Sequence, residues 1–317
     1  VLLHRGRTVE KERVEGSTVM RKSSAFLLVI LLLTATLLAA CGGKQPSGGD
    51  QPSNGTATQQ PSGSGSQEQS GGGAQEPANS LERIKAEGVL RVGIDASYPP
   101  MEFVDEDGKT PIGFDIDMAN AIAEKLGVKA EFTIIDWAGI QAGLLGGHYD
   151  AIMSSMTITE ERQKEMDFVQ YLTMGIAYAS RPGVEVKSDA DLAGKVVVVQ
   201  EETTAQYYIE DLMAEKGIQP KELRSFPYAT DAFRELANER ADVVAIDAPV
   251  AGYYAKLDPD LYRVTGMAEM EPDPIGIALR KGETELRDAI QKAVDELRAE
   301  GVLQELQVKW FGDAAGQ

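Results

Sequence analysis

The residue types that most often carry out catalysis are scarce in this chain. It holds one cysteine, Cys41, and only one histidine, His148, outside the first forty residues. A Cys/His site is therefore excluded from residues 80–317, and a Ser-His-Asp triad would depend on His148 in the turn GGHYD. No phosphate loop of the GxGxxG or Walker A kind occurs. The sequence thus predicts no catalytic residue, no metal site and no cofactor, which favours a binding protein over an enzyme.

The charge balance argues against nucleic acid as a partner. The 317 residues carry 31 Lys and Arg against 50 Asp and Glu, a formal net charge of −19. A field of that sign repels phosphates and favours cationic solutes. A single cysteine also allows no internal disulfide and no cysteine-based zinc cluster.

The first eighty residues have the composition of targeting and linker segments. Basic residues after Met20, an apolar run over 25–33 and small residues up to 40 predict a secretory signal peptide over 20–40. The segment LAAC at 38–41 resembles the bacterial lipobox, which implies that Cys41 carries lipid such as palmitate and begins the mature chain. An ordinary signal peptide with an incidental cysteine is the alternative. Residues 1–19 show no apolar periodicity and indicate an upstream start-codon choice, with Met20 as the working initiator.

Residues 41–80 are almost wholly Gly, Ser, Gln, Pro, Asn and Thr. Because nothing there can bury a core, a disordered tether is predicted. About forty such residues span roughly 35 Å on average and at most roughly 130 Å.

The remaining residues alternate between the periods of strands and of amphipathic helices. The pattern predicts two α/β units with mostly parallel sheets, helices on both faces and a cleft between the units. Helices are expected over 81–87 (capped by Ser80), 115–126, 137–145, 203–216, 231–238 (capped by Thr230), 283–300 and 302–310. Strands are expected over 89–94, 129–135, 150–153, 195–199, 222–226, 242–246 and 275–279.

Several motifs in this body resemble those of the family 3 extracellular solute-binding proteins, the polar amino-acid receptors of bacterial ABC importers. Residues 113–126 read GFDIDMANAIAEKL, close to the family signature. Further matching segments lie at 93–100 (GIDASYPP), 150–162 (DAIMSSMTITEER), 194–195, 203–204, 240–242 and 309–312, so the likeness covers residues 81–312. It implies a type II periplasmic-binding-protein fold of two Rossmann-like lobes joined by a two-segment hinge, near 174–178 and 271–276. Lobe 1 would comprise residues 81–175 and 274–317, and lobe 2 residues 176–273.

The same resemblance implies which residues bind the ligand. Arg162 matches the arginine that holds the ligand carboxylate, a role that suits a planar guanidinium, and Asp247 matches the acid that holds the α-ammonium. Spacing alone favours a surface pairing of Arg162 with Glu161 or Glu165, and Asp247 could equally be a helix N-cap. The other implied ligand-binding residues are Asp95, Tyr98, Trp137, Ser154, Ser155, Thr157, Gln200, Thr203 and Thr204.

One departure from the family pattern lies in the second-lobe loop, where Glu202 stands in place of the usual glycine or small residue. Asp95, Gln200 and the net charge favour a basic ligand, whereas RSFP at 224–227 and IDAP at 246–249 look more like glutamine-binding members. We therefore expect a polar L-amino acid, with Arg, Lys or His slightly ahead of Gln.

The resemblance implies a monomeric, lipid-anchored receptor on the outer face of the bacterial cell membrane. It would deliver its amino acid to the permease and ATPase of an ABC importer. Two alternatives are a cleft enzyme of the same fold, similar to the secreted dehydratases of cyclic acids, and a ligand-sensing receptor for a membrane signalling partner.

Overall fold

The computed structural model describes residues 79–312, which lie within one unit of the chain. The expectations for the upstream segment, the signal peptide, lipidated Cys41 and the tether fall outside the described residues. Among the described residues, none of the helices is long and apolar enough to cross a membrane.

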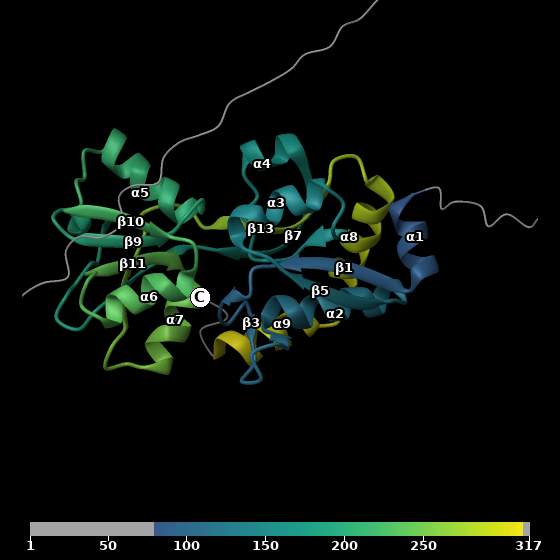
Figure 1. The fold of residues 1–317 in the computed structure, drawn as a ribbon, viewed down its shortest axis with the longest axis horizontal. Coiled ribbons are helices and arrows are strands. Elements are labelled where there is room, and N and C mark those ends of the chain that lie inside the picture. Colours follow the sequence, from purple (N-terminus) through teal and green to yellow (C-terminus); the bar gives the residue numbers. More distant parts are fainter. Residues whose placement is uncertain (1–78, 313–317) are drawn as a thin grey trace, which may run out of the picture. The chain divides into compact units, whose positions relative to one another are not determined.

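The first of two five-stranded sheets has the strand order β5-β1-β6-β13-β7 (Figure 1). β1 (Val89–Ile94) pairs in parallel with β5 (Lys129–Ile134) and β6 (Ala151–Ile152). β13 (Asp273–Arg280) runs antiparallel to β6 and to β7 (Met166–Met174). The helices of this half are α1 (Ser80–Glu87), α2 (Phe114–Leu126), α3 (Trp137–Leu145), α4 (Glu160–Glu165), α8 (Thr284–Ala299) and α9 (Val302–Phe311). A small sheet beside it holds β2 (Ser97–Tyr98), β3 (Glu102–Val104) and β4 (Pro111–Ile112).

The second sheet has the order β10-β9-β11-β8-β12. β9 (Val196–Gln200) pairs in parallel with β10 (Glu222–Phe226) and β11 (Val243–Asp247), whereas β8 (Ile176–Ser180) runs antiparallel to β11 and β12 (Arg263–Met267). Its helices are the 3₁₀ helix η1 (Asp189–Leu192), α5 (Thr204–Glu215), α6 (Ala229–Ala237) and α7 (Ala248–Leu257). The chain passes between the sheets twice, from β7 to β8 and from β12 to β13 (Figure 1).

Every element expected from the sequence is present, with ends within two residues of the predicted bounds, and the structure adds strands that were not predicted, among them β7, β8 and β12. Three further differences concern strand direction and helix starts. Each sheet is mixed, because β13 and β8 are antiparallel insertions into otherwise parallel sheets. The cap of α1 is Asn79, whose side chain accepts a hydrogen bond from the Glu82 backbone, so Ser80 is the first helical residue. α6 begins at Ala229 after Tyr228, which places Thr230 inside the helix and not at its cap.

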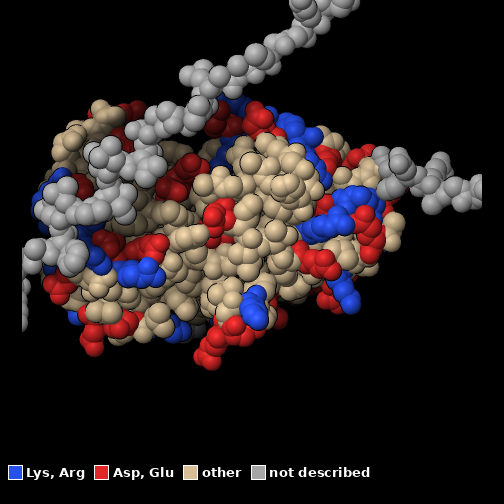
Figure 2. Space-filling model, viewed as in Figure 1, with Lys and Arg blue, Asp and Glu red and all other residues tan. Residues whose placement is uncertain are grey.

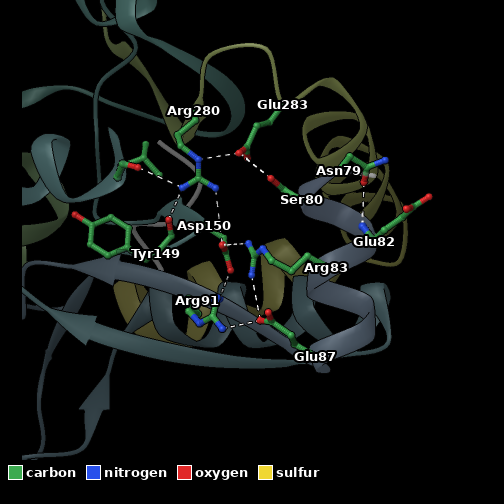
Figure 3. Close-up of polar contacts among 11 residues, drawn as sticks. Asn79, Ser80, Glu82, Arg83, Glu87, Arg91, Tyr149, Asp150, Arg280 and Glu283 are labelled. Atoms are coloured by element: carbon green, nitrogen blue, oxygen red, sulfur yellow. Dashed lines mark hydrogen bonds and ion pairs between the residues drawn. The ribbon is translucent and has the colours of Figure 1, made fainter. Parts of the chain in front are cut away.

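A buried acid fixes α1 to the first sheet (Figure 3). The side chain of Asp150 binds Arg83 of α1 and accepts a hydrogen bond from the backbone of Arg91 at 3.0 Å. Arg280 of β13 lies beside it and bonds Glu283 at 2.7 Å, and Glu283 also accepts from Ser80 at 2.8 Å. The buried charge of Asp150 is tolerated because its partners come from several elements.

On the face drawn in Figure 2, acidic and basic side chains are interspersed around areas of other residues. That face carries no continuous basic patch of the kind that holds nucleic acid.

Two glycines give a paired prediction about packing. A Cβ atom on Gly93 of β1 would lie 2.5 Å from ring carbons of the fully buried Tyr149, whereas one on Gly252, exposed in α7, would meet nothing within 4 Å. Gly93→Ala is expected to lower the free energy of unfolding by about 1–3 kcal/mol through overpacking. Gly252→Ala is expected to raise it by about 1 kcal/mol through helix propensity. Urea unfolding measures both free energies. Equal effects of the two substitutions would contradict the close packing of Gly93 against Tyr149.

A second prediction concerns Glu202 in the β9–α5 loop, which has φ of 58° without being glycine. A left-handed conformation costs a non-glycine residue roughly 1–2 kcal/mol, more than glycine loses in chain entropy. Glu202→Gly is therefore expected to stabilise the protein by about 0.5 kcal/mol. The control is Glu201→Gly next to it, where φ is not positive and a loss of roughly 0.5–1 kcal/mol is expected. Loss of stability in both variants would refute backbone strain at Glu202.

Candidate functional site

A pocket lies between the two sheets, with about 380 Å³ of space free of protein atoms when open solvent at its mouth is counted. All eleven residues that the sequence resemblance implied as ligand-binding line it, together with Glu102 and Ala205. The structure therefore brings the whole predicted set together around one pocket.

Strand ends and helix starts supply these side chains from both halves of the molecule. From the first half come Asp95 after β1, Trp137 at the start of α3, Ser154 after β6 and Arg162 in α4. From the second half come Gln200 at the end of β9, Thr203 and Thr204 at the start of α5, and Asp247 at the end of β11. Parallel strands place such residues at the carboxyl edge of a sheet, where α/β proteins bind their ligands.

Arg162 provides the single cationic group among the pocket-lining residues. Its Nη1 donates to the carbonyl oxygen of Thr157 at 3.0 Å and its Nη2 to that of Glu202 at 3.4 Å, and the guanidinium carbon lies 5.3 Å from the Trp137 ring centroid. Burial lowers the pKa of this guanidinium. Glu161 pairs with Lys164, and among the described residues no ion pair joins Arg162 to Glu161 or Glu165, the alternative that spacing offered.

Asp247 is the pocket acid that the sequence resemblance paired with Arg162 in binding the ligand. It stands at the N-cap position of α7, yet its side chain makes no capping hydrogen bond. Its Oδ2 accepts from the Tyr98 hydroxyl at 2.8 Å, which joins the two halves across the pocket. Burial raises the pKa of Asp247 to about 6, an effect that the nearby Arg162 partly opposes.

A second group of polar residues is connected through Ser154. The Ser154 hydroxyl accepts from the Asp95 backbone at 2.9 Å and donates to Oε1 of Glu102 at 2.8 Å. The Asp95 carboxylate accepts from Nε2 of Gln200, in the other half, at 2.8 Å. Burial raises the pKa of Asp95, and hydrogen bonds from Gln200 and Ser97 act against that rise.

Direct contacts hold the two halves together at the pocket walls. The hydroxyls of Thr157 and Thr204 are 3.2 Å apart, and the Trp137 indole donates to the Glu202 carbonyl at 3.1 Å. At the rim, the Tyr228 hydroxyl donates to Asp136 at 2.7 Å. The cleft is thus closed over the pocket in this structure.

Thr203 and Thr204 have different local roles although they are neighbours. Thr203 is the N-cap of α5, accepting from the Gln206 backbone at 3.3 Å. Thr204 is the first residue of the helix, and its hydroxyl is directed across the cleft to Thr157. The free amide groups of the first helical turn and the helix dipole favour an anion at this end of the pocket.

Of the two pocket residues that the sequence reasoning missed, Glu102 and Ala205, only Glu102 is charged. It lies in β3 of the small sheet and is 1% exposed. The sequence MEFV gives only a strand pattern, and no motif marked this acid. His148, by contrast, is exposed and does not line the pocket.

Comparisons with known proteins agree on the kind of protein. The L-cystine-binding protein TcyJ of Escherichia coli (strain K12) is 33% identical over 235 residues, 73% of this chain and 86% of that protein. An ancestral arginine-binding protein bound to arginine superposes with a TM-score of 0.66 at 40% identity, covering 71% of this chain and 99% of that one. The ancestral amino acid-binding protein AncCDT-1, a precursor of cyclohexadienyl dehydratase, gives 0.65 at 39% identity, covering 73% and 99%.

These solved relatives have the type II periplasmic-binding-protein fold, and the described residues share it. Residues 90–313 match the description "bacterial extracellular solute-binding proteins, family 3" over most of the chain that follows residue 80. The predicted family and fold are therefore confirmed. This chain belongs to the family 3 bacterial extracellular solute-binding proteins.

Proposed function

We propose that this chain captures a polar L-amino acid between its two lobes and delivers it to the permease of an ABC importer. The observation that supports this most is the pairing of Arg162 and the α5 N-terminus with Asp247 in one buried pocket. A free amino acid carries a carboxylate and an ammonium at a fixed separation, and these groups match a guanidinium and a carboxylate respectively.

The charge of the pocket favours a basic amino acid over glutamine. Three carboxyl groups, from Asp95, Glu102 and Asp247, line the pocket against the single guanidinium of Arg162. A ligand with a cationic side chain offsets this excess in a buried site, where charges interact strongly. Relatives named for cystine and arginine show that related pockets serve different amino acids.

Binding and release would follow from hinge motion about the two crossing segments between the sheets. We place the hinge near residues 174–178 and 271–276, with residues 81–175 and 274–317 as lobe 1 and 176–273 as lobe 2. Because the proposed carboxylate site takes groups from both lobes, a ligand would stabilise the closed form over the open form.

A cleft enzyme remains a second candidate, since a buried carboxyl such as Glu102 could act as a general acid. AncCDT-1 is titled a precursor of cyclohexadienyl dehydratase. Incubation of the full chain with cyclohexadienyl carboxylic acids should give no turnover, and detectable product would favour the enzyme. A signalling receptor would bind the same amino acid but would not support its uptake.

The binding proposal predicts a sharp effect of two substitutions. Arg162→Ala and Asp247→Asn are each expected to weaken amino-acid binding by about 2–5 kcal/mol, because each leaves a buried ligand charge without its partner. Arg287→Ala and Asp288→Asn, on the outer surface of α8, are the matched controls. Thermal unfolding of the full chain against the twenty amino acids measures this, since ligand at 100 times Kd stabilises by about 2.7 kcal/mol. Unchanged affinity in a folded pocket variant would sink the assignment.

The proposed anchor at Cys41 makes a separate prediction. In bacterial cells, labelled palmitate is expected to appear in the wild-type chain and to be absent from the Cys41→Ala variant. The variant should then be recovered from the soluble extracytoplasmic fraction. Equal label in both chains would overturn lipidation at Cys41 and leave the binding proposal untouched.

A further inference from the structure

Two motifs of the family likeness, the signature carried by α2 and the closing segment KWFG at 309–312, meet outside the pocket. Asp117 of α2 accepts a hydrogen bond at Oδ2 from the indole nitrogen of Trp310 at 2.7 Å. The same oxygen accepts from Nζ of Lys309 at 2.6 Å, and that ammonium lies 4.8 Å from the centroid of the Trp310 ring. The signature helix therefore holds the end of α9 in a fixed place.

Trp310 in turn supports an aromatic contact between the two halves of the molecule. Its ring stands edge-on to that of Phe103 in β3, with centroids 6.0 Å apart and an interplanar angle of 88° (Figure 1). The Phe103 centroid also lies 6.0 Å from that of Tyr253, which belongs to α7 in the second half. All three rings are partly buried, and neither they nor Asp117 line the pocket. The halves are thus joined by a contact that lies apart from the ligand site.

The pleat of the small sheet explains why this contact lies outside the pocket. Tyr98 of β2 pairs with Glu102 of β3, and both residues line the pocket. Successive residues of a strand point to opposite faces, so the side chain of Phe103 is turned away from the pocket. There it meets the rings of Trp310 and Tyr253.

The β2–β3 hairpin and α7 also meet inside the cleft. Tyr98 of the hairpin donates to Asp247, the N-cap residue of α7, at 2.8 Å. Phe103 of the same hairpin contacts Tyr253 farther along the same helix. A hinge motion that separates Tyr98 from Asp247 would therefore separate these two rings as well.

We infer that the contact of Phe103 with Tyr253 stabilises the closed form, and that Asp117 is a positioning residue for ligand binding because it holds Trp310 behind Phe103. The inference rests on the proposed function. Ligand affinity includes the free energy of closure, so a contact made in the closed form raises affinity without touching the ligand. Loss of the contact should speed release of the ligand and leave its association rate nearly unchanged.

The first test is a double-mutant cycle in the full chain. The probe is the one of the twenty amino acids that gives the largest thermal shift, and isothermal titration measures its affinity. Phe103→Leu and Tyr253→Leu are each expected to weaken binding roughly two- to tenfold, the effect of one aromatic pair, and the double variant should lose no more than either single one. Tyr262→Leu is the matched control, because its ring contacts Phe233 and Tyr254 within the second half alone. It should lower thermal stability and leave affinity unchanged.

A second test separates positioning by Asp117 from a general effect on stability. Asp117→Ala removes the acceptor of the Trp310 indole and should raise the ligand dissociation rate roughly two- to tenfold, as measured by stopped-flow fluorescence. Asp117→Asn keeps an oxygen for the indole and loses only the ion pair with Lys309, so it should restore the wild-type dissociation rate. If Asp117→Ala does not fold, the cycle of Phe103 and Tyr253 decides the inference.

The possible failures are distinguishable. Unchanged or tighter binding in folded Tyr253→Leu, or additive losses in the cycle, would overturn the closing contact, while binding by the wild type keeps the proposed function. A wild-type dissociation rate in folded Asp117→Ala would overturn the positioning role. No thermal shift with any amino acid would refute the proposed function and this inference together.

Discussion

The desolvation of three carboxyl groups beside a single guanidinium is the constraint on which this structure depends. Asp95 is 4% exposed and Glu102 is 1% exposed, and burial raises the pKa of both. With the cleft closed, these groups have lost water and regained only part of the lost interactions from Gln200, Ser154 and Tyr98. Burial of these carboxyl groups in the closed form is therefore costly. A ligand that offers them hydrogen-bond donors would lower that cost in the closed form alone, which is the differential affinity that closure requires.

The walls that hold these charges are rigid for reasons that lie outside the pocket. The buried Asp115 carboxylate, at the start of α2, binds the backbone of Ser155, which has φ of 51°, and the hydroxyl of Tyr171 in β7. Asp115 thus connects the start of α2, the loop after β6 and strand β7. These hydrogen bonds fix the direction of the loop that carries Ser154 and Thr157 into the pocket. α2 thus supports the pocket wall, although none of its residues lines the pocket.

Sequence periodicity was sufficient where a helix or strand has one clear apolar face and a glycine stop. β1, α3 and β10 begin and end where predicted, and Gly88 ends α1 in the left-handed conformation. Strands β7, β8 and β12 were not predicted, because each pairs antiparallel with its neighbours and follows no βα alternation. The pocket residues were predicted from family motifs, whereas Glu102 was missed. Its burial beside Asp115 and Ser154 is a property of three-dimensional packing that no spacing encodes.

The contacts of Arg162 connect the ligand site to closure. One of its nitrogens bonds the Thr157 carbonyl within its own half, and the other bonds the Glu202 carbonyl across the cleft at 3.4 Å. Trp137 donates to that same Glu202 carbonyl at 3.1 Å. A ligand carboxylate would therefore replace the Glu202 carbonyl as the acceptor of the longer Arg162 hydrogen bond. The hydrogen bond from Trp137 to Glu202 would stay in place and keep the two lobes joined. The accepting carbonyl belongs to Glu202, whose φ is 58°. This left-handed backbone suits a glycine, so Glu202 occupies the position at a cost in conformational energy.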